Sequence, residues 1–451
     1  MTRAEGPSFG WLGIFRLGLV QTALGAIIVL TTSTLNRVMV VELALPAMLP
    51  GALVALHYAV QILRPRLGYG SDVGGRRTPW IIGGMAVLGT GGVLAAVATV
   101  LMGSDFILGT LLAIVAFVLV GIGVGACGTS LLVLLAAGVD DRRRAAAATT
   151  VWVMMIAGFV ITAATAGHFL DPFSPARLVS VTAVVSILAF VLTLAATYRI
   201  EGRSPGALDP HGAPHASAAP FREALAQVWG ERRARRFTIF VFVAMLAYSA
   251  QDLILEPYAG TVFGFTPGES TRLAGAQHGG GLVGMLLLAL LGSTAWGRRL
   301  GSMQTWTIVG CVASAMTLCY LALGGFIGPD FPLREAVFAL GLANGLFAVA
   351  AIGSMMSLVG QGRGQREGVR MGLWGAAQAL ALALGGFLGT AAIDLARYLL
   401  DSPVPAYASV FGGEAVLFLV SAALAVWVTR PAGSLAASGY RVGPKGATES
   451  A

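Results

Sequence analysis

Apolar stretches long enough to cross a membrane recur along the whole chain, and they limit its fold more than any other feature. Such a stretch needs about 20 residues, because the hydrocarbon core is roughly 30 Å thick. Hydrophobic residues make up 56% of the 451 positions, and charged residues make up only 11%. Backbone polar groups cannot stay unpaired in lipid, so each stretch is expected to be a helix. We therefore predict an all-α membrane protein with about twelve transmembrane helices.

The loops between these stretches indicate how the chain lies in the membrane. The predicted spans are 16–36, 46–66, 79–102, 106–137, 145–168, 177–198, 236–258, 272–292, 303–326, 333–358, 368–393 and 409–429. Arginines concentrate after the even-numbered spans, so the positive-inside rule places those loops and both chain termini in the cytoplasm. The net charge of +8 is spread over separate loops, which indicates contact with the lipid bilayer and argues against nucleic-acid binding.

A polar segment rich in Gly, Pro, Ser, His and Arg separates the first six spans from the last six. A segment of this composition cannot bury itself and is typical of a linker. We predict an N-terminal six-helix bundle over residues 1–199, a cytoplasmic linker over 200–235, a C-terminal six-helix bundle over 236–430 and a cytoplasmic tail over 431–451.

Matching residues in the two halves indicate a parallel internal repeat. Span one ends with Asn36, Arg37, Glu42 and Pro46, and span seven ends with Gln251, Asp252, Glu256 and Pro257. Span two carries His57 and span eight carries His278; span five runs from Trp152 to Asp171 and span eleven from Trp374 to Asp394. Several matched pairs in the same order are hard to attribute to chance.

The loop after the second span carries Gly68, Asp72, Gly75, Arg76 and Arg77. Glycines allow a sharp turn between helices, a carboxylate can bind a helix N-terminus, and arginines anchor at lipid headgroups. The pattern resembles the signature loop of the major facilitator superfamily. With the six-plus-six arrangement it implies that superfamily's fold, which serves many substrates and so says little about function.

Ionisable side chains inside the spans are costly and are therefore functional candidates. Arg37, Glu42, Asp252 and Glu256 lie toward the predicted periplasmic ends of spans one and seven. They are candidates for a gate or for structural ion pairs, and snorkelling toward the membrane surface is the simpler alternative. The three cysteines all fall within apolar spans, which favours buried thiols over a disulfide or a metal site.

His57 and His278 are the main candidates for binding a substrate or pigment. A neutral imidazole can ligate the magnesium of a chlorin, accept a hydrogen bond or carry a proton, although a packing role is the alternative. The glycines beside His278 leave room either for a flat molecule or for close helix packing. Four further polar residues that could line a cavity or cross-link helices are Gln61, Gln277, Asn344 and Gln378.

Longer segments resemble one family within this superfamily. TTSTLNRVMVVELALPAMLPGALVALHYAVQILRPRLGYGSDVGGRRTPWIIGG, QDLILEPYAG, LAGAQHGGGLVGM and RMGLWGAAQALALALGGFLGT are similar to the PucC/LhaA, or bacteriochlorophyll delivery, family of phototrophic bacteria. The resemblance implies an assembly factor for light-harvesting complexes in the bacterial inner or intracytoplasmic photosynthetic membrane. Its partners would be antenna polypeptides and bacteriochlorophyll or the enzymes that make it, with bacteriochlorophyll as a bound or transient cofactor.

Two other classes of function compete with this interpretation. A pigment synthase that transfers an isoprenoid needs clustered aspartates to hold magnesium and diphosphate. The only adjacent pair, Asp140 and Asp141, lies beside Arg142, so we expect no enzymatic activity. A proton-coupled transporter of small solutes or drugs would need a buried carboxylate, and the central parts of the spans are poor in acids. We therefore favour the assembly factor and keep the transporter as the alternative.

Overall fold

The computed structural model describes residues 9–61, 76–139, 141–201, 229–294, 299, 301–359 and 367–429. All regular secondary structure in these ranges is helical. The first six spans are α1 (Trp11–Val29, continued to Glu42), α3 (Met48–Val60), α5 (Thr78–Met102), α6 (Phe106–Gly138), α7 (Asp141–Phe169) and α8 (Pro175–Thr197). The last six are α10 (Arg232–Phe263), α11 (Pro267–Ser293), α13 (Met303–Ile327), α14 (Leu333–Val359), α15 (Glu367–Leu400) and α16 (Pro403–Thr429).

Each predicted span has its helix, so the expectation of an all-helical membrane protein is confirmed. Eleven helices are long and apolar enough to cross a membrane, and α3 is an apolar helix of 13 residues within the described part. Several helices are longer than predicted. The first span continues to Glu42 rather than ending at 36, and α10 begins at Arg232 rather than at 236. Polar residues at helix ends lower the local hydropathy, so apolar windows miss them.

The two sets of six helices repeat one packing pattern. In the first set, α5 packs on α6 and on α8, α1 packs on α7 and on α8, and α3 packs on α6. In the second set the equivalent pairs are α13 with α14 and α16, α10 with α15 and α16, and α11 with α14. The six-plus-six pseudo-repeat expected from the sequence is therefore present in the fold.

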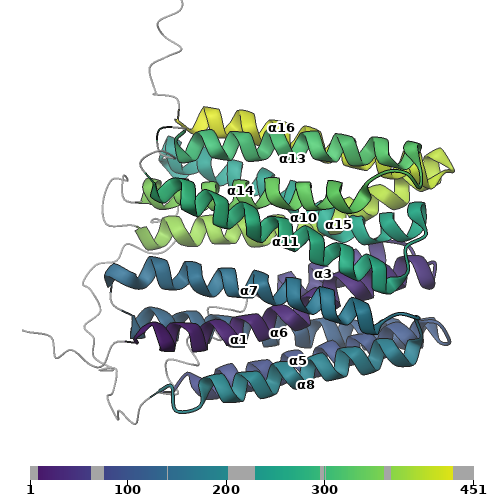
Figure 1. The fold of residues 1–451 in the computed structure, drawn as a ribbon, viewed down its shortest axis with the longest axis horizontal. Helices are drawn as coiled ribbons and strands as arrows, with labels where there is room; N and C mark the ends of the chain where they lie inside the picture. The colour runs from purple at the N-terminus through teal and green to yellow at the C-terminus, as the bar shows by residue number, and fades with distance from the viewer. Residues whose placement is uncertain are drawn as a thin grey trace, which may run out of the picture.

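The two sets meet mainly through four helices. The end of the first span contacts α10 and α11, and the most extensive contacts between the sets are those of α7 with α11 and of α3 with α15. These pairs are equivalent under the repeat, because α7 and α15 are the fifth spans and α11 and α3 are the second. Figure 1 shows the two sets side by side with their helices roughly parallel, the first in purple and blue and the second in green and yellow.

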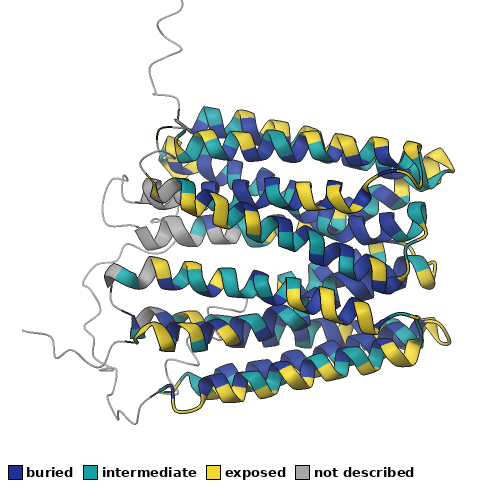
Figure 2. Ribbon diagram, in the orientation of Figure 1, coloured by how far each residue is buried: buried dark blue, intermediate teal, exposed yellow. Residues whose placement is uncertain are grey.

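Burial follows the rules of a membrane protein rather than those of a soluble one. Large apolar side chains such as Leu188, Leu290 and Met316 are exposed on the outer helix faces, where lipid is the solvent. Figure 2 shows these exposed stripes on helices whose other faces are buried. Cys127 and Cys311 are buried as expected, but Cys319 is exposed, because its position on α13 turns away from the neighbouring helices.

Candidate functional site

The first helices of the two sets, α1 and α10, meet at a proline. Pro257 lies inside α10 and has no backbone N–H, so the carbonyl of Leu253 one turn earlier has no helical donor. The Asn36 side-chain amide on α2 (Leu35–Arg37), part of the continued first span, donates to that carbonyl at 2.6 Å. Asn36 is almost completely buried. A backbone group freed by a proline in one set is thus satisfied by a side chain of the other.

Two π-helical segments shape the end of the first span. They are η1 (Leu30–Thr34) and η2 (Val38–Glu42), and they flank α2 on both sides. A π-helical turn holds an extra residue, so it changes the direction of the side chains that follow, and such turns are frequent at functional sites. The Thr34 hydroxyl here lies 3.0 Å from the Thr271 hydroxyl of α11, a second contact between the two sets.

Arg37 is a buried cation at this junction, with 2% of its side chain exposed. Its guanidinium forms an ion pair with Glu42 and donates to the backbone carbonyl of Phe265, in the loop after α10. Glu256 of α10 lies within electrostatic reach of Arg37, and the Ser33 and Ser270 side chains are next to its carboxylate. Neither Glu256 oxygen has hydrogen-bond geometry to a described partner. Three of the four charged candidates therefore lie in one cluster.

A matched pair of aspartates joins the two sets at the same end. Asp394, near the end of α15, accepts hydrogen bonds from the backbone N–H groups of Ala47 and Met48, at 2.9 Å and 2.7 Å. Asp171, just after α7, accepts a hydrogen bond from Thr266 at 2.8 Å and pairs with Arg272 at 3.1 Å. Each aspartate thus lies at or near the end of a fifth span and binds the beginning of the other set's second span.

These contacts all lie at the end of the bundle that the arginine distribution predicts to be periplasmic. They involve the ends of the first and fifth spans and the beginnings of the second. Carboxylates and cations at opposite helix termini are favoured by the helix dipoles as well as by direct bonds. The two sets are therefore held together at this end by a ring of polar contacts.

A second polar cluster lies deeper within the last six helices. Asp252 of α10 accepts a hydrogen bond from the Gln277 amide of α11 at 3.0 Å, and Tyr248 lies one turn away on α10. Glu414 of α16 is close enough to Asp252 for the two carboxylates to interact electrostatically. Gln251, beside Asp252, is fully buried, and neither atom of its amide group has a hydrogen-bond partner among the described residues.

Glu414 is a residue that our sequence interpretation missed. It is 3% exposed, and neither carboxylate oxygen has a hydrogen-bond partner in the described part of the chain. Its position inside the predicted span 409–429 was a sufficient signal, since an acid within an apolar run is a functional candidate by default. The statement that the centres of the spans are poor in acids is therefore too strong for the last six helices.

His278 and His57 have different surroundings. The His278 ring on α11 is partly exposed, and its centroid lies 4.9 Å from that of the Phe159 ring on α7, across the boundary between the two sets. His57 is buried, with its Nε2 atom 2.9 Å from the Gln61 amide one turn along α3. His278 thus lies where the two sets meet, and His57 lies within the first set.

The glycines near His278 serve mostly for helix packing. A Cβ atom on Gly280 or Gly284 would lie 2.1 or 2.2 Å from a carbonyl oxygen of α14, and Gly341 and Gly345 of α14 are equally close to α11. Gly279 differs, because a Cβ there would meet no atom within 4 Å. Of the two interpretations of this segment, close helix packing accounts for Gly280 and Gly284.

The remaining candidates are dispersed. Asn344 accepts a hydrogen bond from Ser314 at 2.8 Å, and Gln378 donates to the sulfur of Met245 at 3.8 Å, so each links helices of the last set. Gly68, Asp72 and Gly75 of the signature loop lie outside the described residues. Arg76 and Arg77 are described at the start of α5, where the Glu201 carboxylate accepts hydrogen bonds from the Arg77 and Thr78 N–H groups, at 2.8 Å and 2.9 Å.

Glu201 lies just after α8, beyond the predicted spans. Partial burial raises its pKa. Hydrogen bonds from the Thr78 hydroxyl and from the two N–H groups, together with the charge of Arg76, lower the pKa by more than burial raises it. The net effect is a pKa below the usual range, so the carboxylate is ionised at neutral pH. Glu201 therefore joins the end of α8 to the N-terminus of α5.

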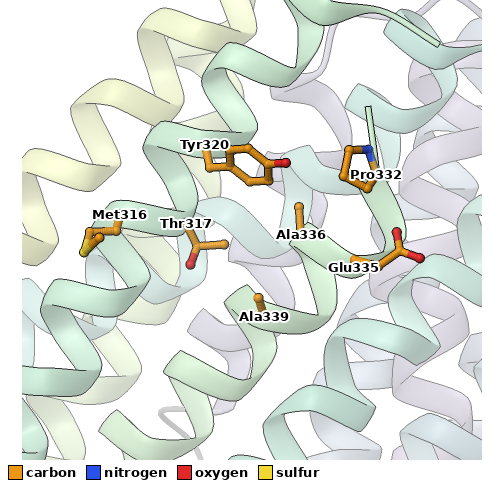
Figure 3. A pocket seen from close by; sticks show the side chains of 7 residues that line it. All are labelled: Met316, Thr317, Tyr320, Pro332, Glu335, Ala336 and Ala339. Atoms are coloured by element: carbon orange, nitrogen blue, oxygen red, sulfur yellow. The ribbon is translucent and has the colours of Figure 1, made fainter. Parts of the chain in front are cut away.

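A groove of about 360 Å³ lies between α13 and α14 on the outer side of the bundle. Figure 3 shows Met316, Thr317 and Tyr320 of α13 facing Ala336, Ala339 and Glu335 of α14. Met316 and Tyr320 are exposed to the lipid side, and none of the residues predicted from the sequence lines this groove. Among the described residues, no group of three or more His, Cys, Asp and Glu side chains could hold a metal ion.

Comparison with known proteins gives matches over most of the chain. The family model described as PUCC protein matches residues 34–433. A Rhodobacter capsulatus protein named bacteriochlorophyll synthase 44.5 kDa chain is 53% identical over 427 residues, which cover 95% of this chain and 97% of that one. Protein PucC of Cereibacter sphaeroides is 30% identical, with 90% of each chain covered.

Solved structures match the fold at low sequence identity. A mutant form of the nucleoside transporter NupG has a TM-score of 0.68 and 12% identity, covering 93% of this chain and 100% of that one. A mutant form of the peptide transporter POT, in complex with alafosfalin, has a TM-score of 0.65 and 15% identity, covering 94% and 96%. The chain is a multi-pass membrane protein with the fold of the major facilitator superfamily.

Proposed function

The chain belongs to the PucC family, and from this premise we propose that it is an assembly factor for photosynthetic light-harvesting complexes that binds bacteriochlorophyll. The name of its 53% identical relative refers to this pigment. The role would be the binding and handing over of pigment, or the chaperoning of antenna polypeptides while pigment is inserted, rather than catalysis. A transporter fold supports this choice, because its two sets of helices offer a boundary at which a ligand can be enclosed.

The observation that carries the proposal is the placement of His278. Its ring is partly exposed at the boundary between the two sets, it packs against Phe159, and no hydrogen bond joins it to another described residue. A neutral imidazole is a common metal ligand in proteins. His278 would hold the pigment through its central magnesium, the aromatic ring of Phe159 would pack beside the macrocycle, and Gly279 leaves free space on the same helix.

The bound pigment would supply the light-absorbing macrocycle, and this chain's residues would orient it and keep it out of the bulk lipid. Gln277 precedes His278 and donates a hydrogen bond to Asp252 of α10, so this part of α11 is fixed against α10. His57 is the second candidate ligand. Its bond to Gln61 and its burial within the first set favour a packing role there.

The test is the absorption spectrum and antenna content of His278→Ala. Protein purified in mild detergent from a phototrophic host is expected to carry near-infrared pigment bands that fall at least 5-fold in this variant, while His278→Gly recovers them when imidazole is added. His168→Ala is the matched control, because His168 is exposed and also packs against a phenylalanine, Phe169. If His278→Ala and His57→Ala both keep full pigment content and full antenna levels in cells, the pigment site is wrong.

A second candidate function, proton-coupled transport of a small solute, is favoured by Glu414 and Asp252. Glu414 is buried without a hydrogen-bond partner among the described residues, and the part-buried Asp252 lies within electrostatic reach of it. Ionisable groups at this depth are costly in a membrane and are typical of proton pathways. Reconstituted vesicles with an imposed pH gradient test this function with labelled nucleosides and dipeptides. Uptake that is lost in Glu414→Gln would support transport, and no uptake by the wild type would leave the assembly factor as the better interpretation.

A further inference from the structure

A pocket of about 300 Å³ lies where α5 begins and α8 ends. Its lining includes a charged rim, formed by the exposed residues Arg76, Tyr198 and Arg199, and an apolar wall, formed by Ile82 and by Leu194, which also faces the lipid side. The charged rim and the apolar wall are adjacent, so the pocket combines the two surfaces that an amphipathic anion requires.

The turn that carries Arg199 is held in place by the fold around it. Arg199 follows α8 with a positive φ of 51°, a backbone region that a residue with a side chain adopts only when the surroundings require it. This turn brings Glu201 back onto the N-terminus of α5, and it leaves the Arg199 guanidinium 5.2 Å from the centre of the Tyr198 ring. Arg16 of α1 holds the turn from the other side by donating to the carbonyls of Ala196 and Tyr198.

The two guanidinium groups have capacity for a ligand. Neither Arg76 nor Arg199 forms a hydrogen bond or an ion pair with another described residue in this structure. The one carboxylate of the pocket, Glu201, already accepts bonds from Arg77 and from Thr78. With two arginines and one carboxylate, the rim has a net positive charge. The parallel N–H groups of a guanidinium can donate two hydrogen bonds to the oxygens of one phosphate.

Side chains also bind the end of the sixth span at the equivalent corner of the last six helices. There the Arg236 guanidinium lies 4.4 Å from the centre of the Trp427 ring and donates to the Trp427 carbonyl at 3.1 Å. Gln304 at the start of α13 donates to the Ala425 carbonyl. Arg236 thus makes the contact that Arg16 makes in the first set, with the backbone at the end of the sixth span.

We propose that this pocket is a binding site for an anionic phospholipid, with the phosphate between Arg76 and Arg199 and an acyl chain along Ile82 and Leu194. Basic pockets between transmembrane helices at the membrane surface bind anionic headgroups, and the apolar wall continues into the lipid-facing surface of α8. The site is separate from His278 and does not depend on the pigment proposal. In this proposal Arg76 of the signature loop binds the lipid phosphate directly.

The experiment is lipid binding to the purified full-length protein, measured by native mass spectrometry and by the thermal shift on lipid addition. Phosphatidylglycerol is expected to bind at least 10-fold tighter than phosphatidylcholine, and Arg76→Gln with Arg199→Gln should remove this preference. Arg232→Gln with Arg235→Gln is the matched control, since both arginines are exposed at the same end of the bundle, at the start of α10. The control should keep the preference.

Ile82→Trp provides an independent test, because it fills the apolar wall without removing either arginine. It should weaken phosphatidylglycerol binding at least 5-fold and leave binding of inorganic phosphate unchanged. Equal binding of the two lipids by the wild type would overturn the proposal, as would a full preference in the double arginine variant. Inorganic phosphate that competes as well as the lipid would show a free-anion site and would also overturn it.

Discussion

The first six helices and the last six share one packing pattern but differ in the chemistry of their buried positions. Serine and proline open both α8 and α16, and at the same distance from the proline α8 has Ser186 where α16 has Glu414. At the matched ends of the first and seventh spans, Arg37 follows Asn36 and Asp252 follows Gln251. The first set thus buries Arg37 and Ser186 where the second set has the part-buried Asp252 and the buried Glu414.

This difference shows which parts of a repeated fold stay the same and which diverge. Both sets retain the same helix pairs and an aspartate at or near the end of the fifth span, and these features serve the scaffold. Buried carboxylates without a hydrogen-bond partner have a cost that packing alone does not require, and among the described residues they lie in the second set, so we expect function to be concentrated there. Four predictions test this view, beginning with the largest expected effect.

Arg37→Ala should have the largest effect on stability. It removes the buried partner of Glu42 and the cation nearest Glu256, which leaves a buried negative charge without compensation. Breaking a buried ion pair costs about 3–5 kcal/mol of the free energy of unfolding. We expect this loss to appear as a lower melting temperature of the purified protein in detergent. Adding Glu256→Gln should recover part of the loss. Arg334→Ala, at an exposed arginine of α14, is the control. If Arg37→Ala and Arg334→Ala lower the melting temperature equally, the buried ion pair contributes no more to stability than an exposed arginine.

Glu414→Met should stabilise the protein, whereas Ser186→Ala at the matched position should have little effect. The buried carboxylate has no hydrogen-bond partner among the described residues, so an apolar side chain of similar volume removes a desolvation cost of about 1–3 kcal/mol. If Glu414 serves function, antenna assembly should fall although the melting temperature rises. If Glu414→Met is less stable than the wild type, the Glu414 carboxyl group has a hydrogen-bond partner in the membrane-embedded protein.

Asp394→Ala should destabilise the contact between the two sets more than Asp171→Ala does. Asp394 accepts two backbone hydrogen bonds at the start of α3, and losing such a cap costs about 1–2 kcal/mol. Asp171 pairs with the part-exposed Arg272, a contact worth about 0.5–1 kcal/mol. Thermal melting of both variants and of the double variant would measure this. A larger loss of stability in Asp171→Ala than in Asp394→Ala would show that the ion pair with Arg272 contributes more than the two backbone hydrogen bonds of Asp394.

Glu201→Gln should have the smallest effect, and the effect should depend on pH. The folded state lowers the pKa of Glu201, so its stabilisation is complete above the unfolded pKa of about 4.3 and is lost as pH falls through the lower folded value. At the matched helix start in the second set, Ser302 caps α13 through a hydroxyl, which does not titrate. The wild type should exceed Glu201→Gln by roughly 0.5 kcal/mol at pH 7, with the difference shrinking below pH ~4. Ser302→Ala should show no such pH dependence.

Hydropathy alone was enough to predict the twelve spans, because the membrane requires a helix wherever about 20 apolar residues occur in a row. It also identified Arg37, Glu42, Asp252 and Glu256 as unusual. It did not identify the donor for the Leu253 carbonyl, because Asn36 reaches it from more than two hundred residues away along the chain. The role of Glu201 was likewise hidden, since its residue type is ordinary at a helix end and only its position over α5 makes it a cap.

The sequence by itself determined the number of membrane helices, the internal repeat and the family, because these depend on residue composition and order along the chain. Only the tertiary structure decided that His278 faces the boundary between the sets while His57 lies inside one of them. It also decided that Glu414 is buried near Asp252, and that a pocket lies where α5 begins and α8 ends. These properties depend on which helix faces meet, and helices of equal hydropathy on all sides do not specify that locally.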